Sequence, residues 1–317
     1  TSTYAAEFGR MPGAQVSVVT RSGANHLHGD VFDYLRNDAL DANDWFANSR
    51  RQPKPPLRQN DFGGVVGGPV VKNRTFFFFS YEGLRLRQPQ FAITEAPTLA
   101  VRNAVAAELK PFINAFPIPN GRDLGAGFAE SFAGYSNPTT LNATSIRIDH
   151  RLNSSMTLFG RYNYAPSDAT QRSSTTLTQL QTNTLNTTTV TLGFTATISA
   201  TTNNDLRFNY SRNTQKRFFW LDSFAGGVPP SDAAMFPSTT DHQSSLFDFN
   251  LGPLVYDVGE SDVPSSQQQF NIVDNFLITT GSHQPKFGID YRRLAPNWAA
   301  LGDNGMAIGT VFADTPS

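Results

Sequence analysis

The stretch TSIRIDHRLNSSMTLFGRYNY, residues 144–164, contains two runs of alternating polarity on either side of a short polar break. Ile146 and Ile148 are separated by charged residues, and this period of two gives a strand one apolar and one polar face. The break, Asn153-Ser154-Ser155, suits a tight turn, and the alternation resumes from Met156 to Tyr164. The stretch therefore predicts an antiparallel β-hairpin.

The same unit recurs three times along the chain. The further predicted hairpins pair Asn60–Val71 with Thr75–Arg87, Thr189–Ser199 with a strand around Leu206–Ser211, and Gln267–Thr280 with Phe287–Arg292. In the last of these, Asp274 has the same parity as Phe270 and Ile272, so we expect a β-bulge there.

Short turns alternate with long polar connections, predicted at residues 38–59, 88–143, 165–188 and 213–266. Within them only Thr98–Phe116 has helical spacing, with Thr98 as its N-cap. This asymmetry is typical of outer-membrane barrels, which have short periplasmic turns and long extracellular loops.

The composition agrees with a barrel. Of the 317 residues 39% are hydrophobic, and no apolar run is long enough for a transmembrane helix. Only helices and closed barrels satisfy all backbone polar groups in lipid, so a membrane protein of this composition would be a β-barrel. The net charge of −1 gives no electrostatic footprint for nucleic acid, and the absence of cysteine excludes disulfides and thiolate metal sites.

The segment GAQVSVVTRSGANHLHGDVFDYLRN, residues 13–37, joins two unlike parts of the chain. A short apolar strand, Val16–Thr20, precedes the Ser22–Asn25 break, and a strand mixed with charges and aromatics begins at His26. We interpret the break as a hinge between a small globular plug and the barrel, on the side of the short turns.

Three groups of blocks resemble TonB-dependent outer-membrane receptors, in particular the Oar-like branch abundant in acidobacteria. They are AEFGRMPGAQVSVVTRSGANHLHGDVFDYLRNDALDANDWF with NDFGGVVGGPVVKNRTFFFFSYEGLRLRQ, then RIDHRLNSSMTLFGRYNY, and then NDLRFNYSRN with DNFLITTGSHQPKFGIDYRR. The resemblance implies a plug domain inside a barrel of 22 antiparallel strands, with import driven by the inner-membrane TonB complex.

On this resemblance the chain is an internal fragment. Residues 1–23 would be the C-terminal end of the plug, and residues 24–317 the N-terminal part of the transmembrane barrel, with about nine strands. The segment that contacts TonB would lie upstream, and the closing strands downstream.

The two faces of the predicted strands would meet different surroundings. The polar positions, which we expect to face the lumen and the plug, are Arg147, Asp149, Arg151, Arg161, Asn163, Arg207, Asn209, Lys286, Asp290 and Arg292. The aromatic positions, which we expect to face outer-membrane lipid, are Tyr162, Tyr164, Phe208, Tyr210, Phe287 and Tyr291.

The long loops would form the rim that captures an extracellular ligand, such as a siderophore or an oligosaccharide. Candidate ligand-binding residues are the loop aromatics Trp45, Phe46, Tyr135, Trp220 and Phe224. The chain gives no reason to expect catalysis: it has neither a G-x-S-x-G nor an H-E-x-x-H motif, and Glu260 and Asp262 lie in a polar connection.

Other motifs have simpler explanations than a cofactor or metal site. Gly63–Gly68 is followed by Pro69, not by the helix that a phosphate-binding loop requires. His26 and His28 are the only close histidine pair, and two ligands do not make a metal site. The acidic group Asp38, Asp41, Asn43 and Asp44 lacks the spacing of a calcium loop, so a solvated loop is the expected structure.

Two other classes of protein share some of these features. A secreted β-rich adhesin or glycan-binding module would bury the apolar faces against a second sheet. A passive porin would lack a globular plug before its first strand, and the segment from Gly13 to Gly23 argues against it.

Overall fold

The computed structural model describes residues 21–251, 254–260, 265–297 and 310–312. Its long strands are β1 (His28–Asn37), β2 (Arg58–Val71), β3 (Thr75–Pro97), β5 (Phe128–Arg151), β6 (Met156–Arg172), β7 (Gln179–Ser199), β8 (Thr202–Leu221), β11 (Ser265–Ile278) and β12 (Lys286–Asn297). The short strands are β4 (Asp123–Gly125), β9 (Leu246–Leu251), β10 (Leu254–Glu260) and β13 (Thr310–Phe312). The helices are η2 (Asp38–Leu40), α1 (Trp45–Ser49), α2 (Leu99–Ala104), α3 (Lys110–Asn114), η3 (Phe224–Gly226) and α4 (Asp232–Met235).

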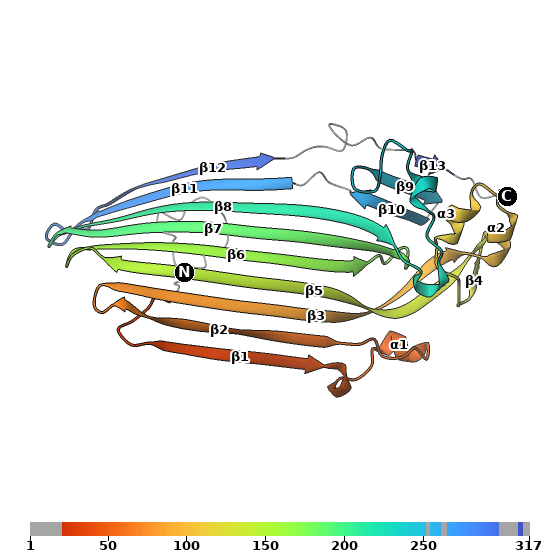
Figure 1. Cartoon of the computed structure of the whole chain (residues 1–317), viewed down its shortest axis with the longest axis horizontal. Coiled ribbons are helices and arrows are strands. Elements are labelled where there is room, and N and C mark those ends of the chain that lie inside the picture. The colour runs from red at the N-terminus through yellow and green to blue at the C-terminus, as the bar shows by residue number, and fades with distance from the viewer. Residues whose placement is uncertain (1–20, 252–253, 261–264, 298–309, 313–317) are drawn as a thin grey trace.

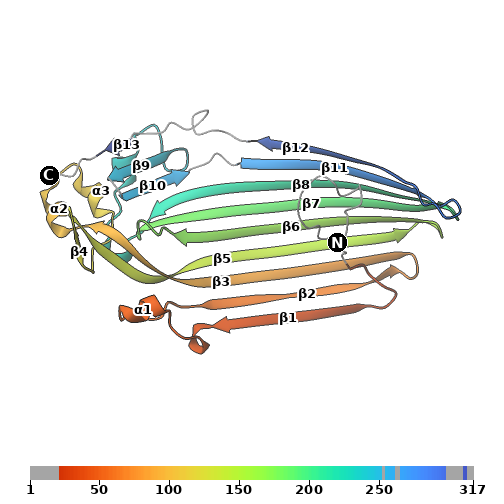
Figure 2. The ribbon, with the colours of Figure 1, turned by 180° about the vertical axis from the view of Figure 1, so that it is seen from behind.

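The long strands form one antiparallel sheet in the order β1-β2-β3-β5-β6-β7-β8-β11-β12. In the described part of the chain there are nine strands of ten residues or more, as expected, and all four predicted hairpins are present. The sheet is curved and open, with β1 and β12 at opposite edges (Figure 1; Figure 2). The fold is therefore part of an antiparallel barrel.

The strands are longer than the sequence predicted. The connection expected at residues 165–188 is wrong: β6 and β7 stay paired up to Arg172 and Leu180, leaving residues 173–178 as the loop. Strands β3 and β5 likewise extend into the expected loop 88–143, and β8 extends into the expected loop 213–266. Beyond the membrane both faces of a strand can meet water, so the alternation of polarity fades while backbone pairing continues.

The register of the paired strands places apolar and polar residues on opposite faces of the sheet, as predicted. One row across neighbouring strands is apolar and consists of Val66, Phe79, Ile146, Tyr162, Val190, Tyr210 and Phe270. The next row on the opposite face contains Arg147, Arg161, Thr191, Asn209, Asn271 and Arg292. The apolar side chains are not covered by protein; Leu192, for example, is 46% exposed. We call the two sides the lipid face and the lumenal face.

The bulge expected at Asp274 is wrong. The register of β11 with both β8 and β12 runs unbroken through this residue. Asp274 lies on the lipid face opposite Leu206, and its Oδ1 accepts a 2.6 Å hydrogen bond from Nδ2 of Asn204. A neighbouring amide thus satisfies the misplaced carboxylate, and the strand needs no extra residue.

The buried core lies at the end of the sheet opposite the short turns, where the helices of the described residues gather (Figure 1). Its members are Ile113, Ala115, Phe116, Phe128, Met235, Phe236, Phe247, Phe249, Tyr256 and Val258. We call this part the cap. The helix expected over Thr98–Phe116 is divided into α2 and α3; Thr98 caps α2 as predicted, and Pro111 occupies the first turn of α3, where its missing N–H costs nothing.

Arg102 holds the cap together from inside. Its guanidinium donates to the carbonyl oxygens of Pro97, Ile113, Phe116 and Pro117 at 2.6–3.1 Å. Burial lowers the pKa of Arg102 to about 10, so the group stays charged at neutral pH. These bonds join the end of β3 to α3 and to Phe116 and Pro117, which follow the C-cap of α3.

The predicted hinge lies beside the first short turn, as expected. Asn25 Nδ2 donates to Asn73 Oδ1 at 2.6 Å, and the Asn73 backbone N–H donates to Asn25 Oδ1 at 2.8 Å. Gly23 lies against the backbone of β2 and β3, where a Cβ would come within 2.4 Å of the carbonyl oxygen of Phe77. The proposed plug strand, within residues 1–20, lies outside the described residues.

Candidate functional site

The first long loop, residues 38–57, joins β1 to β2 at the cap end of the sheet. Asn37 caps η2, and the Asp44 carboxylate caps α1 by accepting from the N–H groups of Phe46 and Ala47 at 2.8 and 3.1 Å. The Lys54 ammonium donates to the carbonyl oxygens of Asp38 and Asp41. The loop is therefore a folded element fixed by its own caps and cation.

These contacts account for most of the acidic group in this loop. Asp44 is a helix cap, Asp41 pairs with Arg36 at 3.2 Å, and Lys54 lies where a bound cation would meet the loop carbonyls. Two acceptors, Asp38 Oδ1 and Asn43 Oδ1, are buried without a hydrogen-bond partner. Within the described ranges, no three His, Cys, Asp or Glu side chains gather as possible metal ligands.

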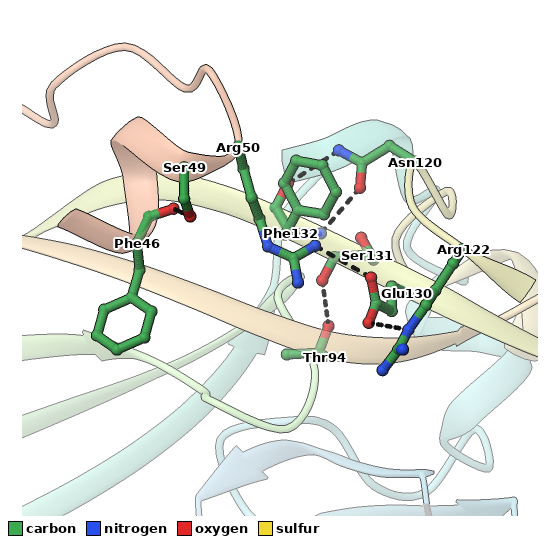
Figure 3. Close-up of polar contacts among 9 residues, drawn as sticks. All are labelled: Phe46, Ser49, Arg50, Thr94, Asn120, Arg122, Glu130, Ser131 and Phe132. Carbon is green, nitrogen blue, oxygen red and sulfur yellow. Dashed lines mark hydrogen bonds and ion pairs between the residues drawn. The ribbon is translucent and has the colours of Figure 1, made fainter. Parts of the chain in front are cut away.

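An ionic clasp attaches this loop to the sheet (Figure 3). Arg50, at the C-terminal end of α1, donates to Glu130 Oε2 at 3.0 Å, while Arg122 Nε donates to Glu130 Oε1 at 2.7 Å. The Arg50 guanidinium also lies 4.8 Å from the centre of the Phe132 ring. The hydrogen bond from Arg50, followed by that from Arg122, lowers the pKa of Glu130 and keeps it ionised.

The strand residues beside the clasp are fixed in turn. Asn120 exchanges two 2.9 Å hydrogen bonds with the backbone of Phe132, and Thr94 Oγ1 donates to the Ser131 carbonyl at 3.2 Å (Figure 3). In the same view the Phe46 ring points away from the clasp. The contacts of Arg50 therefore do not involve the Phe46 ring on α1.

A cleft of about 800 Å³ lies between the first long loop, the start of β2 and the middle of β3. Its strand wall includes four successive β3 residues, Gln88–Phe91, and its loop wall includes Phe46 and Lys54. Successive strand residues point to opposite faces, so a cleft that reaches all four runs along the strand edge. The pairing of β2 with β3 ends at Arg58 and Arg87. The β3 edge from Gln88 onward is therefore open toward the loop.

The structure brings the predicted ligand residues together in two pairs. Trp45 and Phe46 are stacked edge to face, with centroids 5.1 Å apart, and are 72% and 58% exposed. Tyr135 and Phe224 are similarly arranged at 6.1 Å. Trp220 belongs to neither pair, and its Nε1 donates to Thr182 Oγ1 at 3.4 Å. Of these five aromatics, only Phe46 lines the cleft.

The second pair is built around Arg172. Its guanidinium lies 4.0 Å from the Phe224 centroid and 5.7 Å from that of Tyr135, and it makes a bidentate contact to Asp222 at 2.7 and 2.8 Å. Burial raises the pKa of Tyr135. With its guanidinium engaged on several sides, this group is better suited to holding β5, β6 and the β8 connection together than to binding a ligand.

Sequence reasoning missed the residues that shape the cleft. Arg50 and Glu130 are 80 positions apart, and Glu130 fell within an expected loop. Gln88, Gln90 and Phe91 were also placed in that loop, although the structure has them in β3. A polar stretch with strand propensity is the one signal that could have extended β3 past Arg87.

The other motifs considered in the sequence lie in or beside strands where the structure describes them. Gly63–Gly68 lies within β2, as a strand and not as a phosphate loop. The His28 ring contacts the His26 carbonyl at 3.1 Å. Glu260 ends β10, and Asp262 lies outside the described residues. Among the described helices, none is both long and apolar enough to cross a membrane.

Comparison with known proteins agrees with this architecture. The family model for the outer membrane β-barrel domain matches residues 19–310. The TonB-dependent transporter Oar of Myxococcus xanthus is 34% identical over 87 residues, which is 26% of this chain and 8% of that transporter. No solved structure matches the chain. Because the family model covers most of its length, the chain belongs to the outer membrane β-barrel domain family and is located in the bacterial outer membrane.

Proposed function

We propose that the chain is part of a TonB-dependent receptor and transporter that imports a bulky, scarce ligand. The observation that carries the proposal is the similarity to the TonB-dependent transporter Oar, combined with the barrel family. That similarity covers a small part of Oar, so plug, TonB contact and ligand all belong to the proposal.

The arrangement of the chain supports import through the barrel. The cap and the first long loop stand at one end of the sheet, and the Asn25–Asn73 contact fixes the incoming chain at the other. In the proposal the loops capture ligand at the outer surface, the plug enters at the hinge, and outer-membrane lipid surrounds the apolar band. The role is transport and includes no catalytic chemistry.

A soluble adhesin would need a second sheet over the apolar face. In the described residues Ile148, Leu192 and Ile272 on this face are exposed, and no protein layer covers them. Lipid supplies the missing contact in the proposed function.

The test uses the full-length protein in its native host. We expect it to fractionate with the outer membrane and to require detergent for extraction. A strain lacking the protein and a strain with inactive TonB should leave the same solute unused in the culture medium, as measured by mass spectrometry. Depletion of that solute by the TonB-inactive strain would contradict energy-coupled import.

A further inference from the structure

We propose that the cleft beside the first long loop binds a neutral, hydroxyl-rich ligand, of the chemistry of an oligosaccharide. This inference rests on the proposed function, because it assigns a ligand class to the mouth of the transporter. It follows from which groups in the cleft are already engaged and which are free.

Four of the five charged side chains that line the cleft have a hydrogen-bond partner, and the exception is Asp38. Arg36 pairs with Asp41, and the Lys54 ammonium is bonded to two loop carbonyls. The Asp44 carboxylate is held by two backbone N–H groups. An ionic ligand would have to displace one of these partners, and the carboxylates of the lining outnumber its cations, which disfavours an anion.

The free polar groups of the cleft are amides. Gln59 on β2, and Gln88 and Gln90 on β3, make no side-chain hydrogen bond within the described structure. Gln59 is opposite Leu86, and Gln88 and Gln90 follow Leu86 at alternate positions, so these amides share one face. Each amide has two donor hydrogens and an acceptor oxygen, which suits hydroxyl groups that both donate and accept.

Aromatic rings stand on both walls of the cleft. Phe46 comes from the loop. Phe91 comes from β3, where it points to the face opposite Gln88 and Gln90, so a ligand meets both the ring and the amides by passing round the open strand edge. Flat apolar rings provide contact area for the C–H face of a sugar ring, while the amides fix its orientation, as in binding sites that combine apolar walls with a few polar groups. A small inorganic anion would leave both rings unused.

Two unsatisfied acceptors favour a ligand that brings donors. Asp38 Oδ1 and Asn43 Oδ1 are buried within residues that line the cleft, and neither has a hydrogen-bond partner. Asp38 Oδ1 is 3.9 Å from Arg58 Nε, which is too far for a hydrogen bond. A small shift of the loop would expose these oxygens to ligand hydroxyls, whereas an anion has no donor to offer.

The test measures binding to the full-length protein in detergent. Probes are neutral gluco-, manno- and galacto-oligosaccharides, oligouronates of matched length, and an extended peptide. Fluorine NMR of 5-fluorotryptophan, with the Trp45 resonance assigned by its loss in a Trp45→Phe variant, reports on the cleft because the Trp45 ring contacts Phe46. We expect a neutral oligosaccharide to bind, and the Gln88→Ala, Gln90→Ala variant to weaken its Kd about tenfold or more.

Gln243→Ala, in the exposed Asp241–Ser244 turn, is the matched control and should bind as the parent does. A variant is compared only if it keeps the heat-modifiable migration of a folded barrel. Binding of no neutral probe, tighter binding of the oligouronates or the peptide, or an unchanged Kd in the double glutamine variant would overturn the proposal.

The outcomes separate this inference from the proposed function. If TonB-dependent uptake persists for a charged solute and the glutamine variant does not alter it, the subsite is wrong and the transport role stands. If neutral oligosaccharides bind the cleft but their uptake does not require TonB, the subsite stands and the transport role fails.

Discussion

Arg50 of α1 and Glu130 of β5 are joined by a 3.0 Å contact between Nη1 and Oε2, although 80 positions separate them in the chain. This contact holds the first long loop against the extended part of the sheet. The loop forms one wall of the cleft, so the pair helps to fix that wall against the sheet.

Breaking the clasp should release α1. In Glu130→Gln, the neutral amide can no longer form the charged contacts to Arg50 and Arg122, so trypsin should cut after Arg51 about fivefold faster. The measurement is the rate of cleavage in the folded, detergent-solubilised protein. Glu108→Gln, at an exposed residue with no ion pair in the described structure, is the control and should be cut at the parental rate.

The clasp should also open in acid. The two arginine contacts lower the pKa of Glu130, so their stabilising effect is complete above the ordinary glutamate pKa and is lost as pH falls through the lowered pKa. We therefore expect the rotational mobility of α1 to rise only below the ordinary pKa of a glutamate. The fluorine NMR line width of 5-fluorotryptophan at Trp45 measures this, with the resonance assigned by its loss in a Trp45→Phe variant. A transition near neutral pH would contradict the assignment.

Adjacent positions on β7 should differ sharply in their tolerance of charge. Leu192→Lys puts an ammonium on the lipid face and should cost about 2–4 kcal/mol of folding free energy near the bilayer midplane. Thr191→Lys puts the same group on the lumenal face and should cost much less. Urea unfolding of the full-length protein in lipid vesicles measures both. Equal losses would invalidate the assignment of faces.

The β9–β10 hairpin of the cap should be stabilised by removing a carboxylate. Burial, followed by the nearby Asp248, raises the pKa of Asp257, so its contribution to stability is greatest in acid and falls as pH rises past the unfolded value. At neutral pH, Asp257→Asn should therefore slow hydrogen exchange in the hairpin, by about threefold.

Asp241→Asn serves as a control of opposite sign. A hydrogen bond from Ser244 lowers the pKa of Asp241, so the ionised form stabilises its turn at neutral pH and the substitution should speed local exchange. The same direction of change in both variants would contradict this account of the cap.

The topology predicts which sites a protease reaches on intact cells. Trypsin should cut the folded full-length protein after Arg51 in the first long loop, and should spare Lys72 and Arg74 in the short turn at the other end. Mass spectrometry of the released peptides identifies the sites. Cleavage at Arg74 with protection of Arg51 would reverse the proposed orientation.

Much of the membrane part could be predicted from the sequence. The strands around Ile146 and Tyr162 alternate in polarity because lipid lies on one side and a wet interior on the other, and that contrast fixes the face of every residue. The short turns were equally clear, since Asn73 and its neighbours are typical turn residues; Asn73 adopts a φ of 61°.

The outer part could not be predicted in the same way. From Ala165 to Thr188 the strands are rich in Thr and Asn and meet water, so periodicity disappears although the ladder continues. At Asp274 the polarity pattern predicted a β-bulge that is absent. Asn204 donates a hydrogen bond to the Asp274 carboxylate, so the regular strand accommodates it. The clasp and the cleft depend on contacts between distant segments, and a single sequence carries no signal for these.

The apolar side chains of this protein lie in two separate environments, because the buried cluster is in the cap and the apolar strand face is in contact with lipid. The strands are stabilised by lipid along one face, whereas Phe116, Phe249 and Tyr256 exclude water only after reaching the far side of the membrane. Insertion and cap assembly are therefore distinct events in biogenesis. Substitutions in the cap and substitutions on the lipid face should therefore affect different steps of assembly.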